Sequence, residues 1–346
     1  MSKIKYLSIF LLPATVLVSF CTEGILNFLP LIVFFGLLPV VEQFLPLQES
    51  NLSPQEAEKA EKDPYYELLL YLMMPVQWGF LVYFLFTIEE ASNSHVLIGR
   101  ITSMGIMCAV IGINLGHELG HHDNKISRYI GEILLLSSLQ NHFLPYHNRG
   151  HHTNVGTRQD PATARKNETM YVFWFRSQIG SYFEAWKIEM QKCRIQQKPP
   201  LHYSNKMIQY TIAHILLLSS IFYFFGSLVL WYFIIAAIMG IVQLESVNYI
   251  EHYGLYRNKN KNGVYERVQR HHSWNSNHYL GRLILFELSR HSDHHYKANR
   301  PYQILESHKE SPVMPAGYPA MMMLALFPPL FFRIMNPRVS IAMSGQ

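Results

Sequence analysis

Histidines recur in this sequence at spacings that could hold metal ions. The cluster HELGHH occupies residues 117–122, and its His117 and His121 are four residues apart, so a helix would present both on one face. Two later clusters are HNRGHH at 147–152 and RHSDHH at 290–295, and a single histidine, His252, ends the sequence NYIEH. Because neutral imidazole is a common metal ligand, this pattern predicts a metal centre.

The number of spaced histidines indicates more than one metal ion. A tetrahedral zinc ion takes four ligands, whereas nine candidates are present. They are His117, His121, His147, His151, His152, His252, His291, His294 and His295. Imidazole suits iron, zinc, copper or nickel, so the ligand type leaves the metal open.

Other polar residues near these histidines are expected to orient the imidazoles without binding the metal. Few carboxylates lie among the histidines, which argues against a bundle of the Glu-x-x-His type. Hydrogen bonding from neighbouring groups commonly fixes the rings of metal-binding histidines. The candidates for this role are Glu118, Asp160, Asn248, Glu251, His271, His272, Asn277, His278 and Asp293.

Two simpler explanations of the histidines are less consistent with the pattern. An isolated HExxH is typical of a zinc protease with the glutamate as base, but a protease needs only one further ligand and has no use for the later clusters. Packing within the fold could explain a few histidines individually, but not several spaced clusters. Those few are His95, His142, His202, His214 and His308.

The elements that must position these clusters are expected to be membrane helices. Apolar residues make up 49% of the chain and charged residues only 15%, against about 25% in soluble proteins. Stretches long enough to cross a bilayer lie near 6–21, 25–41, 68–88, 96–116, 207–225 and 227–247. No small-residue cleavage site follows the first stretch, so we expect it to be retained. The sequence predicts an all-α integral membrane protein with six transmembrane helices in three hairpins.

The distribution of basic residues predicts the orientation. Segments 1–5, 42–67, 117–206 and 248–346 hold 28 of the 29 lysines and arginines, and Arg100 is the exception. Because short basic loops stay in the cytoplasm, both termini and the histidine clusters are expected there. The chain is then one domain, 1–346, with a cytoplasmic histidine-rich cap formed by 117–206 and 248–346.

The remaining segments carry weaker signals. Residues 132–139 and 318–332 are apolar but too short or too rich in proline to cross, which favours interfacial or re-entrant pieces. The polar segment 48–64 is expected to be an exposed loop. A net charge of +5 without a basic motif gives no support for nucleic-acid binding. The three cysteines form no CxxC pair.

The clusters HELGHH, HNRGHH, NYIEHYGL and RHSDHH resemble, in order and spacing, the membrane alkane 1-monooxygenase family. That family belongs to the membrane fatty acid desaturase and hydroxylase superfamily. Further similar text is DPATAR at 160–165, HHSWNSNH at 271–278 and AGYP at 316–319, and the resemblance covers roughly residues 25–340. NYIEHYGL resembles the hydroxylase branch rather than the desaturases.

The resemblance implies a non-haem di-iron centre held by the same nine histidines. Two positions depart from the family pattern, since His122 replaces a usual lysine and Tyr146 a usual glutamate. Neither removes a ligand, but Tyr146 takes away an acid that would orient one, and His122 adds a possible competing ligand. No catalytic side chain beyond the metal centre is expected.

The resemblance also implies a reaction and its partners. The expected reaction uses O2 to hydroxylate the terminal methyl of medium- or long-chain n-alkanes to 1-alkanols at the bacterial cytoplasmic (inner) membrane. The alkane would enter from the bilayer along Phe34, Phe35 and Trp78. Because the chain lacks a flavin, iron-sulfur or haem motif, a separate carrier must supply electrons. In this family the carrier is rubredoxin with its reductase, and a basic face could receive it: Arg257, Lys259, Lys261, Arg267, Arg270 and Arg300.

Three alternatives stay open at this point. A fatty acyl desaturase or a xylene-type methyl hydroxylase of the same superfamily would carry similar clusters. A histidine-rich membrane metal transporter is more remote, because it would need polar residues at mid-membrane depth, and the predicted spans have few.

Overall fold

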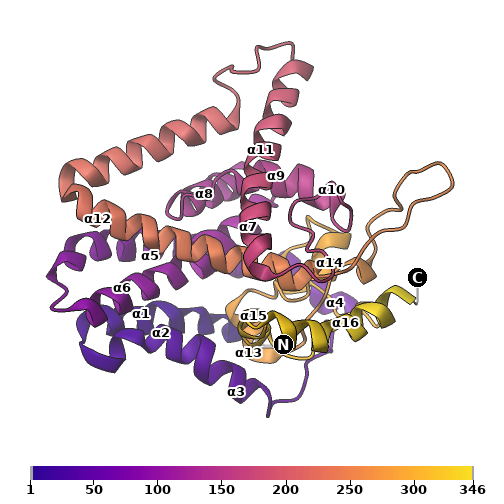
Figure 1. The fold of residues 1–346 in the computed structure, drawn as a ribbon, viewed down its shortest axis with the longest axis horizontal. Coiled ribbons are helices and arrows are strands. Elements are labelled where there is room, and N and C mark those ends of the chain that lie inside the picture. Colours follow the sequence, from indigo (N-terminus) through magenta and orange to yellow (C-terminus); the bar gives the residue numbers. More distant parts are fainter. Residues whose placement is uncertain (1–2, 345–346) are drawn as a thin grey trace.

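The computed structural model describes residues 3–344, and they form an all-helical protein (Figure 1). Within that range there is no β-strand, only the isolated bridges Lys259–Tyr265 and Asn275–Val313. The predicted all-α class is therefore confirmed.

Five helical segments are long and apolar enough to cross a membrane: Lys3–Cys21, Gly24–Glu42, Pro64–Glu90, Ser94–Gly120 and Lys206–His252. The first combines η1 (Lys3–Phe10) and α1 (Leu11–Cys21), and the second runs through η2 (Gly24–Phe28), α2 (Leu29–Leu31), η3 (Ile32–Leu37) and α3 (Leu38–Glu42). The third is α5 (Pro64–Thr87) with η4 (Ile88–Glu90). The fourth joins α6 (Ser94–Met107), η5 (Cys108–Leu115) and α7 (Gly116–Gly120).

The fifth segment, α12 (Lys206–His252), is 47 residues long and bends sharply at Gly226. Gly226 has φ 81° and ψ 176°, a backbone conformation that residues with a Cβ rarely adopt. Figure 1 shows the two arms of α12 meeting at this bend, and the second arm runs beside α5 and α6. The predicted stretches 207–225 and 227–247 correspond to these two arms.

The remaining helices gather at the ends of the long ones. Between α7 and α12 lie α8 (Lys125–Leu136), α9 (Phe143–Tyr146), η6 (His147–His151), α10 (His152–Asn154) and α11 (Met170–Ile195). After α12 come η7 (Arg270–His272), α13 (Tyr279–Ile284), α14 (His291–Tyr296), η8 (Tyr302–Ile304), α15 (Tyr318–Ala325) and α16 (Pro328–Ser344).

One expectation needs correction here. Segment 48–64 is not a loop throughout, because α4 (Pro54–Glu61) forms within it, opened by a capping box between Ser53 and Glu56. The stretch 318–332 is divided as expected, because α15 ends at Ala325 and Pro328 and Pro329 begin α16, the position where a helix tolerates proline. The segment 132–139 forms the end of α8 and the turn after it. In the α8 part, Leu134 and Leu135 are buried.

Candidate metal centre

The nine spaced histidines come from four separate parts of the chain that meet at one end of the long helices. His117 lies on α7 and His121 directly follows it, while His147, His151 and His152 lie on η6 and α10. His252 ends α12, and α14 carries the other three. All nine ligand atoms fall into two compact groups.

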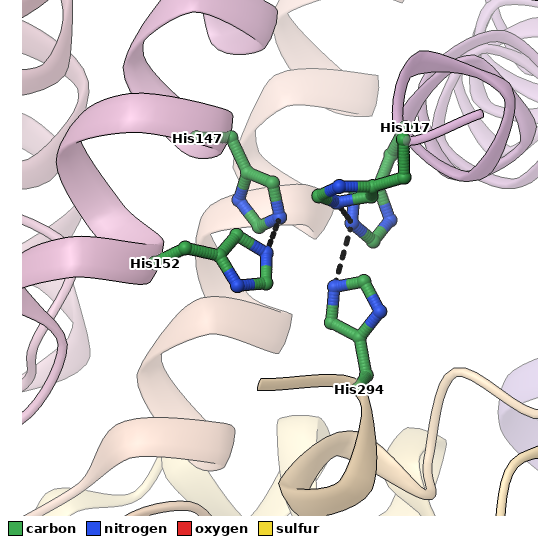
Figure 2. Close-up of side chains that lie close together, drawn as sticks. His117, His147, His152 and His294 are labelled. Atoms are coloured by element: carbon green, nitrogen blue, oxygen red, sulfur yellow. Dashed lines mark hydrogen bonds between the residues drawn. The ribbon is translucent and has the colours of Figure 1, made fainter. Parts of the chain in front are cut away.

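The first histidine group consists of His117, His121, His147, His152 and His294, whose ligand nitrogens all lie within 4.8 Å of one another. Figure 2 shows four of these rings turned toward a common centre. Nε2 of His117 lies 3.2 Å from Nε2 of His294 and 3.0 Å from that of His121. Nε2 of His152 lies 2.9 Å from that of His147.

The second histidine group consists of His151, His252, His291 and His295, all buried. Nε2 of His252 lies 3.1 Å from Nε2 of His151 and 3.0 Å from that of His291. His295 completes the group, with its Nε2 2.9 Å from that of His291.

The backbone of η6 explains how the cluster HNRGHH at 147–152 contributes histidines to both groups. His147 and His151 are four residues apart, so a regular α-helix would place them on one face. Residues His147–His151 instead form a wider π-helical turn, which brings His147 next to His152 and sends His151 to the second group. On α14, where the helix is regular, His291 and His295 stay together.

The geometry of both groups fits a bound metal ion. Two nitrogens held about 2.1 Å from one ion and at right angles would lie about 3.0 Å apart. The Nε2–Nε2 distances of 2.9–3.2 Å match this spacing. Five nitrogens in one group and four in the other are enough for one ion each.

Burial keeps the ring nitrogens available as ligands. Burial, reinforced by neighbouring imidazoles, lowers the pKa of His147, His152, His291 and His295 well below its ordinary value. Burial also lowers the pKa of His294 to about 4. These rings are therefore neutral at physiological pH, which is the form that binds metals.

Asp160 is the carboxylate most directly attached to a candidate ligand. Its Oδ2 accepts hydrogen bonds from Nδ1 of His151 (2.8 Å) and from the hydroxyl of Thr163 (2.6 Å). The hydroxyl of Tyr146 donates to Oδ1. Tyr146 replaces an acid of the family pattern, yet it contacts the acid that orients His151, a role that the sequence did not indicate.

Glu251 faces the metal-binding atom of a histidine rather than its far side. Its Oε2 lies 3.2 Å from Nε2 of His291, and its Oε1 accepts a hydrogen bond of 2.7 Å from Tyr318. Tyr318 belongs to the AGYP sequence, but its contact with Glu251 had no signal in spacing or composition.

The other predicted orienting residues have different partners. Glu118 accepts from the backbone N of Tyr302 (3.0 Å), and Asp293 contacts Arg300, His308 and the backbone N of Glu306. Asn248 contacts Glu245, His278 contacts Ser276, and the backbone oxygen of Asn277 accepts from Gln48. His271 and His272 form a separate cluster with Glu266.

His122, the possible competing ligand, lies outside both histidine groups. Its Nδ1 is 3.4 Å from a carboxylate oxygen of Glu67, and its Nε2 is 3.6 Å from one of Glu118. Burial opposes protonation of His122, but these two carboxylates outweigh it and raise its pKa.

An apolar cavity runs from the long helices to both histidine groups. Its empty space, part of which is open to the surroundings, is about 860 Å³, and its lining includes Phe34, Phe35, His117, His147 and His291. Leu38, Ile106, Val110 and Leu244 contribute to its walls. Trp78 does not belong to the lining, and its indole instead donates to the carbonyl of Ile133 (3.1 Å).

Comparisons with known proteins agree with this arrangement. Residues 92–325 match the fatty acid desaturase family. The chain is similar to alkane 1-monooxygenase 1 of Alcanivorax borkumensis, with 38% identity over 90% of this chain and 77% of the relative. It is 37% identical to an alkane 1-monooxygenase of Ectopseudomonas oleovorans, over 91% of this chain and 79% of the relative. Identity to the xylene/toluene monooxygenase hydroxylase component of Pseudomonas putida is 28%, over 81% of this chain and 76% of the relative.

Proposed function

Since the chain belongs to the alkane 1-monooxygenase family, within the broader fatty acid desaturase family, we propose that it hydroxylates the terminal methyl of medium- or long-chain n-alkanes with O2. The product is a 1-alkanol. Residues 1–346 would form one catalytic domain.

The observation that carries the proposal is the course of the apolar cavity. Part of its wall comes from the candidate membrane spans Gly24–Glu42, Ser94–Gly120 and Lys206–His252, and its lining includes histidines of both groups. Transfer of each methylene from water to an apolar site contributes about 0.8 kcal/mol, so the walls favour a hydrocarbon chain and exclude water. Such a cavity supports a substrate that is apolar along its length and reacts at its end.

The nine histidines would hold two iron ions, five nitrogens around one and four around the other. Iron bound there would pass electrons from an external carrier to O2 and so activate it toward an unreactive C–H bond. The chain's own residues fix the rings. Asp160 orients His151, and Phe143 stacks on His147 with ring centroids 4.5 Å apart.

The membrane arrangement that accompanies this function has six spans, with the two arms of α12 as the fifth and sixth. Both termini and the histidine groups lie on the cytoplasmic side of a bacterial inner membrane. The distribution of lysines and arginines supports this orientation.

The electrons come from rubredoxin and its reductase, docking through opposite charges. Of the six basic residues predicted to form this face, three are engaged within the protein. Arg257 donates to the carbonyl of Glu266, and Arg270 and Arg300 contact Asp293. Lys259, Lys261 and Arg267 are therefore the better candidates.

Product analysis tests the proposal against its alternatives. Purified protein with reduced rubredoxin should convert octane or hexadecane to the 1-alkanol, as measured by gas chromatography. Oxidation of xylene alone would favour the methyl hydroxylase alternative, to which the lower identity of 28% gives less support. An unsaturated product from palmitoyl substrates would identify a desaturase. Metal uptake into vesicles without oxidation would favour a transporter.

A further inference from the structure

A second, basic pocket opens where two candidate spans end. Gly120, the last residue of the span Ser94–Gly120, and Lys206, the first of Lys206–His252, both contribute to its lining. The pocket lies between α8, α11 and the start of α12, and its empty space, part of which is open to the surroundings, is about 1040 Å³. The ends of membrane spans lie at the bilayer surface, so these candidate spans would place the pocket at headgroup depth.

The charges in the pocket favour an anion. Five cationic side chains line it: Lys125, Arg128, Arg149, Lys192 and Lys206. Its two carboxylates are already paired, because Glu189 accepts from Lys192 (3.0 Å) and Glu132 from Lys206 (2.8 Å). Within residues 3–344, Lys125, Arg128 and Arg149 have no carboxylate partner, so the pocket carries a surplus of positive charge.

The surroundings of the pocket favour an anion with apolar tails. Ile126 and Tyr129 lie beside Lys125 and Arg128 on the exposed face of α8, and they are 63% and 64% exposed. On the first arm of α12, Ile212 and Ile215 are also exposed. Aromatic and basic side chains at the interface above exposed aliphatic ones are typical of lipid contact.

We propose that this pocket binds the phosphate headgroup of an anionic phospholipid, whose acyl chains lie along the exposed residues of α8 and α12. Lys125, Arg128 and Arg149 contact the phosphodiester, and Tyr129 lies at the level of the headgroup. Basic pockets beside membrane helices bind anionic headgroups in this way. The pocket is distinct from the cavity that reaches the histidines, and the proposal does not depend on the proposed function.

The pocket also touches the elements that hold the first histidine group. Asn148, which lines it, follows His147 and donates from its side-chain amide to the carbonyl of Gly120 (2.9 Å). Gly120 in turn precedes His121. A bound headgroup would therefore hold α7, η6 and α8 in their relative positions.

Lipid retention by the full chain tests this proposal. We would measure binding of phosphatidylglycerol and of phosphatidylcholine to the detergent-solubilised protein by native mass spectrometry. The double variant Lys125→Gln/Arg128→Gln should bind phosphatidylglycerol about 30-fold more weakly, since each basic residue contributes roughly fivefold. The matched control Lys187→Gln/Arg194→Gln removes two exposed charges from α11 outside the pocket and should bind like wild type.

Further arms separate the possible occupants. Arg128→Lys keeps the charge and should retain the lipid, which distinguishes lost binding from misfolding. Equal binding of the two lipids, or equal loss in the control double variant, would overturn the proposal. Binding of inorganic phosphate without phosphatidylglycerol would overturn it in favour of a free anion. If Lys125→Gln/Arg128→Gln lost rubredoxin binding but kept lipid binding, the occupant of the pocket would be an acidic protein instead of a lipid, and the proposal would be overturned.

Discussion

Nδ1 of His151 donates a hydrogen bond to Oδ2 of Asp160 over 2.8 Å, and both side chains are buried. Burial alone would raise the pKa of Asp160, but His151, Thr163 and Tyr146 outweigh it and lower the pKa to about 2. Asp160 is therefore ionised, and it holds His151 with Nε2 free to face the second histidine group. The carboxylate thereby fixes both the tautomer and the direction of the ring.

Replacing Asp160 should weaken metal binding without removing a ligand. We expect Asp160→Asn to lower iron affinity by about 10–100-fold, because a neutral amide is a weaker acceptor for Nδ1 of His151 than a carboxylate and can also turn its NH2 donor toward the ring. Iron retained after dialysis against a chelator measures the effect. Tyr146→Phe removes one donor to Asp160 but leaves the contact between Asp160 and His151, so this variant should lose less iron affinity. Wild-type retention in Asp160→Asn would contradict the orienting role.

Removing one ligand from a histidine group should weaken binding of the ion in that group more than binding of the other ion. Wild type is expected to bind two iron ions per chain, since nine nitrogens exceed the needs of one. His121→Ala and His252→Ala should each lower the content toward one. The exposed His95 lies outside both groups, so His95→Ala is the control. A single tightly bound zinc ion in wild type would exclude the di-iron centre.

Glu287 connects the N-terminal helix to the chain that precedes α14. Its carboxylate accepts from the hydroxyl of Tyr6 (2.8 Å) and from Arg282 (2.7 Å), and only 2% of the residue is exposed. Removing one partner of a buried ion pair costs about 3–5 kcal/mol. We therefore expect Glu287→Gln to destabilise the protein by that amount, measured by unfolding in detergent. Glu58→Gln breaks an exposed pair with Lys62 and should cost much less.

The same residue predicts a pH dependence. Burial would raise the pKa of Glu287, but Arg282, Lys5 and Arg290 lower it below its ordinary value. A lowered folded-state pKa contributes stability above the unfolded-state value of about 4.3, and this contribution is lost as pH falls through the folded-state value. As the pH is lowered below about 4.3, the stability of wild type, measured by its unfolding midpoint, should therefore decrease more steeply than that of Glu287→Gln. Parallel curves would mean that Glu287 is not charged in the folded protein.

Local signals in the sequence predicted much of this architecture, but not the sorting of the histidines. Apolar length was enough to locate the long helices, because a bilayer requires it. The helix at Pro54–Glu61 was missed although Ser53 and Glu56 form a capping box, because the polar composition of the segment suggested a loop. The assignment of His151 and His152 to different groups depends on the π-helical turn, and side-chain spacing alone predicts the regular α-helix.

Reporter fusions test the orientation. A cytoplasmic reporter should be active at Gln346, which lies outside the described residues, and a periplasmic reporter should be active when inserted at Ser92. Ser92 is exposed in the short connection between η4 and α6, where few basic residues lie. Periplasmic activity of the C-terminal fusion would put the histidine groups on the other side of the membrane.

The longest alkane accepted should depend on the two aromatic residues in the cavity wall. Phe34 and Phe35 both line it, and Phe34 is only 6% exposed, so its ring fills space that a longer chain would need. A further methylene gains about 0.8 kcal/mol from apolar transfer, whereas forcing it into filled space costs about 1–3 kcal/mol. Steric closure should therefore set the limit. We expect Phe34→Ala or Phe35→Ala to extend the range to longer alkanes, as measured by gas chromatography, with iron content unchanged. Phe20→Ala removes a buried ring outside the cavity lining and should leave the range as it is. If neither cavity variant shifts the longest substrate, the chain end is stopped by another part of the wall.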